Sequence, residues 1–176
     1  MKKILIAYVT KTGTTQETAE VLNQIFLARD LLVEVKPLST VTNLDGFSGV
    51  VIGAPINGMS WLPEAVEFVR NFKSVLQSIP TAYYLHSYML DNCRPFWQNQ
   101  IDKSFHPAEA ILKPIMEGMF GGRIATELPL FARLIFGVRK NTPLDRRNPA
   151  EIQAWAEKLA DVFLHKSGNA SDRMAH

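Results

Sequence analysis

The stretch from Tyr8 to Leu22 constrains this chain more than any other. An apolar strand predicted over residues 3–9 stops abruptly, a hydroxyl-rich turn follows, and an amphipathic helix is predicted over residues 14–28. Unpaired backbone N–H groups and the helix dipole make such a helix start attractive to anions. Gly13 has no Cβ, so a ligand can approach its backbone closely. The predicted anion-binding residues are Thr10, Lys11, Thr12, Gly13, Thr14 and Thr15.

The spacing within this turn excludes two common nucleotide-binding loops. A P-loop requires a Gly-Lys-Ser/Thr triplet and a dinucleotide fingerprint requires three glycines, whereas this turn has Gly13 alone. Lys11 is its only basic residue, so neutral donors and the helix end would hold a phosphate, which favours a permanently bound monoester. The alternative is an ordinary strand–turn–helix. Thr14 and Glu17 are predicted to form a capping box at the helix start.

Strands and helices alternate along the chain. Further strands are predicted over residues 31–35, 49–53, 81–86 and 115–120, and helices over 63–76 and from 149 onward. Strict alternation implies an α/β fold, in which a doubly wound parallel sheet lies between two layers of helices. Right-handed crossovers place the C-terminal ends of the strands along one edge, where ligands bind.

Length and composition predict one globular domain. The chain has 176 residues, 47% hydrophobic and 20% charged. We expect residues 1–165 to form this domain and residues 166–176 a flexible tail. The early strand excludes a signal peptide, no apolar run reaches spanning length, and Cys93 is the single cysteine, so we expect a cytoplasmic protein. We find no metal-ligand spacing, and a net charge of +2 is too small to predict nucleic-acid binding.

The first loop resembles the signature of the flavodoxin family. The matching positions are an aromatic residue, two threonines around a small residue, an alanine and an aliphatic residue: Tyr8, Thr10, Gly13, Thr15, Ala19 and Leu22. Ala7 departs from the bulkier residue usual before the aromatic one. The resemblance implies a three-layer αβα domain with a five-stranded sheet in the order 2-1-3-4-5, and it implies that residues 10–15 hold the phosphate of FMN.

The same resemblance places two further loops around the flavin ring. The loop after the third strand would lie against the isoalloxazine, and the loop after the fourth strand would cover its other face. Trp61 belongs either to this site or to the core, and His86 is either a donor to the flavin or a strand-end histidine satisfied by the protein. The implied residues are Pro55, Ile56, Asn57, Gly58, Met59 and Trp61 in the first of these loops and His86, Ser87 and Tyr88 in the second.

Two segments are similar to one branch of the family, the flavodoxin-like, quinone-dependent protoporphyrinogen IX dehydrogenases of bacteria. They are Val50 to Ile56 and Gly121-Gly122-Arg123, with residues that follow each. This resemblance implies an FMN-dependent oxidoreductase that passes electrons from a reduced organic substrate to a quinone, with Arg123 or Arg133 pairing with substrate carboxylates. Two alternatives stay open. One is an electron carrier between protein partners, against which the lack of a strongly acidic composition argues; the other is an NAD(P)H-dependent quinone reductase.

Residues 128–140 combine apolar side chains with the basic residues Arg133, Arg139 and Lys140. As a helix interrupted at Gly137, this segment would lie on an anionic bilayer, where each nearby basic residue contributes about 1 kcal/mol. The alternative is a core-packing helix whose basic C-terminus favours the helix dipole. The segment therefore predicts either peripheral contact with the inner face of the cell membrane or an ordinary buried helix.

Overall fold

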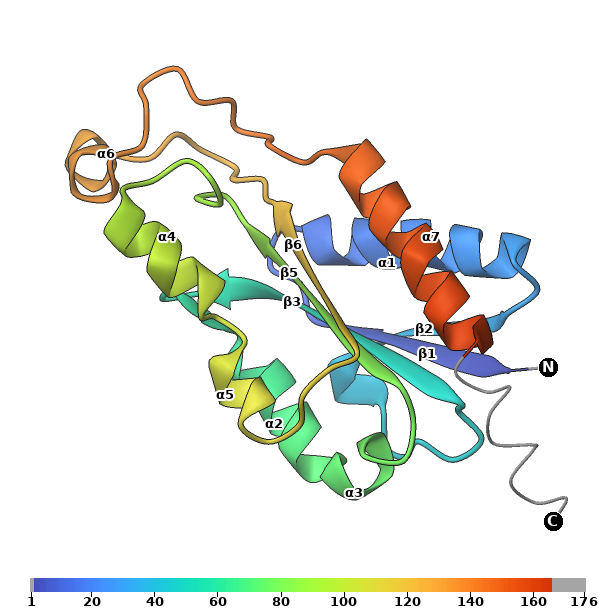
Figure 1. Ribbon diagram of the computed structural model, residues 1–176. Coiled ribbons are helices and arrows are strands. Elements are labelled where there is room, and N and C mark those ends of the chain that lie inside the picture. Colours follow the sequence, from blue (N-terminus) through green and yellow to red (C-terminus); the bar gives the residue numbers. More distant parts are fainter. Residues whose placement is uncertain (1, 166–176) are drawn as a thin grey trace, which may run out of the picture.

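A computed structural model describes residues 2–165 of the chain, and Figure 1 shows its elements. The predicted tail, residues 166–176, lies outside the described residues. The strands are β1 (Lys3–Tyr8), β2 (Leu32–Pro37), β3 (Gly49–Asn57), β4 (Ser60–Trp61), β5 (Thr81–Ser87) and β6 (Met116–Gly121). The helices are α1 (Thr14–Ala28), α2 (Pro63–Asn71), α3 (Lys73–Leu76), α4 (Pro95–Asp102), α5 (His106–Glu109), α6 (Leu130–Phe136) and α7 (Pro149–His165), with a 3-10 turn, η1, at Leu38–Thr40.

Parallel strands form the central sheet in the order β2-β1-β3-β5-β6. This confirms the predicted order 2-1-3-4-5, since β5 and β6 are the fourth and fifth parallel strands. The sequence pattern does not indicate the short β4, which pairs antiparallel with the end of β3, Ile56 opposite Trp61 and Asn57 opposite Ser60. That pairing carries β3 beyond its predicted end at residue 53.

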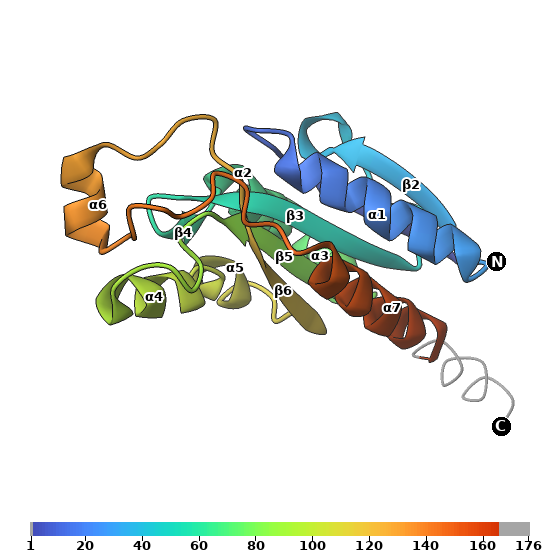
Figure 2. The same ribbon diagram turned by 90° about the horizontal axis from the view of Figure 1, so that it is seen from above.

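Helices cover both faces of the sheet, as Figures 1 and 2 show. Side chains alternate along β1, so Ile4 faces one layer and Leu5 the other. On the first face α1 and α7 lie side by side, and Phe26 meets Phe163 edge-on with ring centroids 5.8 Å apart. On the second face α2, α3 and α5 cover the sheet, with Phe68 buried there. Each fully buried side chain of this kind contributes roughly 1.5–3 kcal/mol.

Some of the predicted helix ends agree with the structure and others do not. α1 has the predicted bounds, and Asn148 caps α7, since its Oδ1 accepts from the N–H of Ala150 at 3.2 Å and its Nδ2 donates to Glu151 at 2.7 Å. The helix predicted over residues 63–76 is in fact two, α2 and α3. The chain leaves helical geometry at Phe72, which has φ −103° and ψ 12°.

The chain makes an excursion between β6 and α7, and we call residues 124–144 the α6 arm. The arm is closed at its base, where the N–H of Ile124 donates to the carbonyl of Leu144 at 3.0 Å and the N–H of Arg146 donates to the carbonyl of Gly122 at 3.1 Å. Both views show α6 projecting at one end of the molecule beside α4 (Figures 1 and 2). The helix is shorter than predicted because Gly137, with φ 75°, ends it.

α6 exposes its apolar side chains instead of burying them. The exposed fractions are 75% for Leu130, 66% for Phe131, 62% for Leu134 and 52% for Ile135. Only Ala132 of this helix is fully buried. The core-packing alternative for this segment is therefore wrong for most of its side chains. Among the helices within residues 2–165, none is long and apolar enough to cross a bilayer.

Candidate functional site

The loop between β1 and α1 leaves donors open at the helix start. Gly13 adopts φ 83°, and its N–H donates to Thr10 Oγ1 at 3.0 Å, which holds the turn. The hydroxyls of Thr12 and Thr14 share a hydrogen bond of 3.1 Å. In the described part of the chain, no acceptor takes the backbone N–H groups of residues 14–16. These donors, at the positive end of the helix dipole, suit an anion.

Glu17 does not form the predicted capping box with Thr14, and no side-chain hydrogen bond caps α1. Its carboxylate instead meets two arginines: Oε1 accepts from Arg123 at 2.9 Å and Oε2 pairs with Arg147. These partners lie 106 and 130 positions further along the chain. A local pattern cannot anticipate them, which is why this expectation is wrong.

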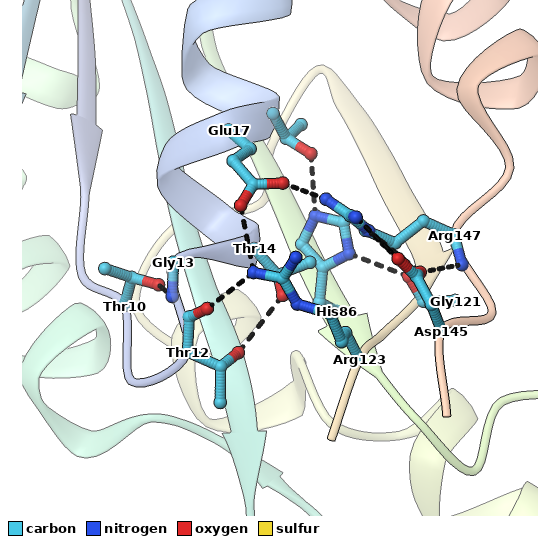
Figure 3. A network of polar contacts seen from close by, with 11 residues as sticks. Thr10, Thr12, Gly13, Thr14, Glu17, His86, Gly121, Arg123, Asp145 and Arg147 are labelled. Carbon is cyan, nitrogen blue, oxygen red and sulfur yellow. Dashed lines mark hydrogen bonds and ion pairs between the residues drawn. The ribbon is translucent and has the colours of Figure 1, made fainter. Parts of the chain in front are cut away.

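Figure 3 shows these contacts as a line of alternating charges beside the first loop. Arg123 Nη2 also donates to the carbonyl of Thr12 at 3.0 Å. Arg147 bridges Glu17 to Asp145, and hydrogen bonding to Arg147 lowers the pKa of the Asp145 carboxyl to about 2. The line of charges therefore ties the base of the α6 arm to the loop after β1. Among these charged groups, sequence reasoning named Arg123 as a candidate substrate contact and Glu17 only as a capping residue.

The loop after β3 is a tight hairpin. Its central residues, Gly58 and Met59, have φ 59° and 66°, the positive values of a type I′ turn. Ser104 supports the turn from the chain between α4 and α5, because its Oγ donates to the carbonyl of Met59 at 3.3 Å. The hairpin therefore presents a fixed backbone at the C-terminal edge of the sheet.

Trp61 belongs to the core and not to the ring site. Its side chain is 1% exposed and packs against Tyr83 and Phe105, with ring centroids 4.9 and 5.2 Å away. The indole Nε1 donates to the carbonyl of Ala54 at 3.2 Å. A large aromatic ring next to a hydrophobic layer is buried there, and its polar atom finds a backbone acceptor. This corrects the flavin-contact expectation for Trp61.

His86, at the end of β5, has both ring nitrogens hydrogen-bonded within the protein. Nδ1 lies 3.0 Å from the carbonyl of Gly121, which only accepts, so Nδ1 carries the proton and Nε2 accepts from the Thr18 hydroxyl at 2.9 Å. Burial lowers the pKa of His86 to about 4, so the ring is neutral near pH 7. No nitrogen is left to donate to a ligand, and the strand-end alternative describes this residue.

The loop after β5 is held by the base of the α6 arm. Arg146 Nη1 donates to the carbonyl of Tyr88 at 3.0 Å and also to that of Leu90. The Tyr88 hydroxyl donates to the carbonyl of Thr142 across 3.5 Å. A Cβ on Gly122 would lie 2.9 Å from the Tyr88 nitrogen, so this close approach requires glycine. Arg146 and its neighbour Arg147 thus fix two different loops.

A cavity of about 300 Å³ lies among the three loops and the α6 arm. The helix start forms its polar end, and the arm forms an apolar wall. The predicted residues that line it are Lys11, Thr12, Thr14, Thr15, Pro55, Ile56, Gly58, Met59, His86, Ser87 and Tyr88. Thr10, Gly13, Asn57 and Trp61 do not line it. Sequence reasoning missed Met89, Gly122, Ile124, Leu128 and Phe136, mostly because it could not show the arm folding back.

A larger cavity of about 890 Å³ lies on the other side of the first loop, beside α2. Its lining includes Glu64 and Glu67, which disfavour an anion. We place the site in the smaller cavity, because it contains the open helix start and lies where the parallel strands end. Within residues 2–165, no group of three His, Cys, Asp or Glu side chains could hold a metal ion.

Arg133 does not reach this cavity with a free guanidinium. Its Nε donates to the carbonyl of Leu128 at 2.9 Å, its Nη1 to that of Lys140 at 2.7 Å, and its Nη2 to Glu127 at 2.6 Å. The side chain is 13% exposed. Arg133 therefore holds the α6 arm together, and the expectation that it pairs with a substrate carboxylate is wrong.

Comparisons with known proteins identify the family and agree with the fold. The model of the flavodoxin domain family matches residues 5–143. No curated protein matches the chain. Among solved structures, a flavodoxin from Streptococcus pneumoniae TIGR4 has 13% identity and a TM-score of 0.59, covering 93% of this chain and 99% of that one. Flavodoxin 1 from Bacillus cereus has 13% identity and a TM-score of 0.58, covering 93% and 97%. A mutant flavodoxin from Fusobacterium nucleatum, solved with flavin mononucleotide, has 12% identity and a TM-score of 0.55, covering 90% and 97%.

Proposed function

Because the chain belongs to the flavodoxin family, we propose that it is an FMN-dependent oxidoreductase that passes electrons from a reduced organic substrate to a quinone. The observation that carries this is one cavity with an open helix start at its polar end and an apolar arm as its wall. When bound, FMN supplies the redox chemistry, while the protein binds it and tunes its potential. Overall, the substrate loses two electrons and two protons, and the quinone gains both to become a quinol.

The residues around the cavity fit FMN at both ends. The hydroxyls of Thr12 and Thr14, with the open N–H groups beside them, suit a phosphate monoester. Met59 and Tyr88 with Phe136 of the arm offer the soft and flat apolar surface that suits an isoalloxazine ring. These residues bind and orient the cofactor and exclude water, and the reaction requires no protein nucleophile.

The α6 arm favours an acceptor dissolved in a membrane. Leu130, Phe131 and Leu134 are each more than three-fifths exposed, and Phe136 of the same helix lines the cavity. Residues 128–140 carry no acidic side chain. Arg139 and Lys140 are exposed in this segment, where they favour anionic headgroups. We therefore propose that this cytoplasmic protein works at the inner face of the cell membrane, with the α6 arm against lipid.

Two rivals use the same cavity. An electron carrier between protein partners is compatible with the family, although a net charge of +2 gives no acidic field to steer basic partners. An NAD(P)H-dependent quinone reductase would differ only in its electron donor. Protoporphyrinogen IX is our candidate substrate, and its support is the resemblance of Val50–Ile56 and Gly121-Gly122-Arg123 alone.

The test begins with colour. The purified protein should be yellow and should release FMN, not FAD, on heating. Under anaerobic conditions protoporphyrinogen IX should bleach the flavin band, and menaquinone should restore it with one quinol formed per two electrons removed. Faster bleaching by NADPH would establish the reductase instead, and exchange with protein partners alone would establish the carrier. A folded sample that stays colourless in excess FMN would overturn the whole proposal.

A further inference from the structure

We propose that Arg123 is a ligand of the cofactor phosphate and sets the preference of the site for FMN over riboflavin. This inference rests on the proposed function. Arg123 follows β6, yet its guanidinium reaches the loop after β1, where Nη2 donates to the carbonyl of Thr12 at 3.0 Å (Figure 3). A Cβ built on Gly13 would lie 3.7 Å from the same nitrogen. The Arg123 guanidinium therefore lies at the polar end of the cavity, and Arg123 is one of the residues that line this cavity.

The first loop itself brings little positive charge to the site. Lys11 is its single basic residue, and the remaining donors are neutral hydroxyls and N–H groups. A phosphate monoester carries up to two negative charges, and a guanidinium binds phosphate oxygens through two parallel N–H groups. Both side-chain hydrogen bonds of Arg123 with the described residues use Nη2. Its Nε and Nη1 donate to no residue within 2–165, so each has an N–H open to a phosphate oxygen. Both parallel donor pairs of a guanidinium include Nη2, so a two-pronged contact requires Nη2 to turn from Glu17 to the phosphate.

The charged residues around Arg123 are arranged so that it can bind an anion. Glu17, in the first turn of α1, would repel a phosphate if its charge were unopposed. Its two carboxylate oxygens meet different arginines, Oε1 with Arg123 and Oε2 with Arg147. Arg147 is itself fixed by Asp145, through Nε to Oδ1 at 2.9 Å. If Arg123 turns towards the phosphate, Glu17 keeps Arg147 as a partner, which it shares with Asp145.

The place of Arg123 in the chain gives this contact a second effect. Ile124 and Leu128, which follow it in the α6 arm, line the same cavity. A phosphate held by Arg123 therefore fixes the start of the arm against the loop after β1. Riboflavin, which lacks the phosphate, cannot make this link.

Affinity for FMN and for riboflavin should be measured by fluorescence quenching in the full chain, in Arg123→Ala and in Arg123→Lys. Arg123→Ala should weaken FMN binding about tenfold or more, as for a hydrogen bond to a charged group, and leave riboflavin binding unchanged. Arg123→Lys keeps the positive charge but loses the paired N–H donors, so its FMN affinity should lie between those of the parent and Arg123→Ala. The dependence of FMN affinity on salt should become shallower in Arg123→Ala.

Arg70→Ala is the matched control, because Arg70 also pairs with a helix glutamate, Glu67, but lies on α2. It should leave both affinities unchanged. Equal losses for FMN and riboflavin in Arg123→Ala would show that Arg123 only supports the arm, and an unchanged FMN affinity would exclude it as a ligand; either result overturns this inference alone. If the unsubstituted chain binds neither ligand, the proposed function falls and this inference with it. A thermal melt of each variant identifies misfolding, in which case Arg123→Lys decides.

Discussion

The hydroxyl of Tyr84 donates a hydrogen bond of 2.8 Å to the carbonyl of Thr15. This contact joins β5 to the first turn of α1. The Tyr84 ring is fully buried and crosses Gly53 of β3, where a Cβ would lie 2.0 Å from Tyr84 Cζ. Burial raises the pKa of Tyr84, so the hydroxyl keeps the proton it donates. One side chain thus fixes the distance between the start of α1 and the sheet.

Tyr84→Phe should therefore affect both stability and cofactor binding. Removing one buried hydrogen bond should lower the free energy of unfolding by about 1 kcal/mol in urea denaturation. FMN affinity should fall several-fold, because the start of α1 loses its anchor. Tyr83→Phe is the control: its hydroxyl donates to the carbonyl of Leu112 at 2.9 Å on the other face of the sheet. It should cost similar stability and leave FMN affinity unchanged, and equal effects on affinity would contradict the anchoring role.

Gly53→Ala should destabilise the protein by about 1–3 kcal/mol or more, because the new methyl group overlaps the Tyr84 ring. A double-mutant cycle with Tyr84→Ala checks the cause by urea denaturation. If overlap is responsible, the double variant should lose less stability than the sum of the two single variants. Strict additivity would mean that another contact sets the cost.

Stability should fall as the pH drops from about 6.5 towards 4. The pKa of His86 is about 4 in the folded chain and near 6.5 when unfolded, so the unfolded state takes up the proton first. The loss should approach about 3 kcal/mol below pH 4. His86→Gln should show a flatter profile in urea denaturation at each pH. A profile as steep as that of the parent would exclude His86 as the source.

Glu117 changes the stability with pH in the direction opposite to His86, over an overlapping pH range. Burial, and then Glu109, raise its pKa to about 7. The folded state therefore holds this proton more tightly, and the contribution of Glu117 to stability grows as the pH falls from 7 to about 4.5. Because both the parent and His86→Gln keep Glu117, the difference between their two profiles isolates His86.

Replacing Phe131 and Leu134 by Gln should weaken binding to vesicles that contain anionic phospholipid. Each replacement removes a large apolar side chain that would be buried in the lipid, so the affinity measured by co-sedimentation with the vesicles should fall about tenfold or more. Leu27→Gln is the control, since this side chain is 51% exposed on α1. Vesicles of neutral phospholipid should bind the parent less tightly, because Arg139 and Lys140 then lack a partner. If Leu27→Gln loses as much vesicle binding as the replacements on α6, or if the parent does not bind vesicles, the α6 arm is excluded as a lipid contact.

Thr12→Asp should abolish FMN retention during gel filtration. The added carboxylate would lie at the polar end of the cavity and repel the phosphate. Thr42→Asp adds the same charge at an exposed position after η1 and should leave the protein yellow. Retention of FMN by Thr12→Asp would move the phosphate away from this loop.

Features that depend on neighbouring residues could be read from the sequence. The periodicity of residues 14–28 predicts α1 with the bounds that the structure has, and Asn148 caps α7 as its pattern indicates. Alternation and handedness predict the parallel sheet, while the strand order, which is confirmed, came from the resemblance of the first loop to the flavodoxin signature. The resemblance also named three loops, and the structure brings residues of all three around one cavity, since the ends of parallel strands meet at one edge of the sheet.

Features that depend on distant contacts could not be read in this way. Trp61 follows the hairpin as a ring-binding residue would, yet Tyr83 and Phe105 draw it into the core. Glu17 stands where a capping residue belongs, but Arg123 and Arg147 compete for it successfully. In both cases the interactions with residues distant in the sequence form in place of the predicted local one. A single sequence does not show which distant segments come together.

The closed base of the α6 arm has a consequence for how this protein can diversify. Because hydrogen bonds join Ile124 to Leu144 and Gly122 to Arg146, the insertion leaves and rejoins the domain at one closed point. Exposed residues between them that do not line the cavity, such as Leu130 and Phe131, can be exchanged without disturbing the strand order, whereas Leu128 and Phe136 belong to the cavity wall. Redox partners could thus be changed by altering the outer face of the arm while its inner face continues to enclose the flavin.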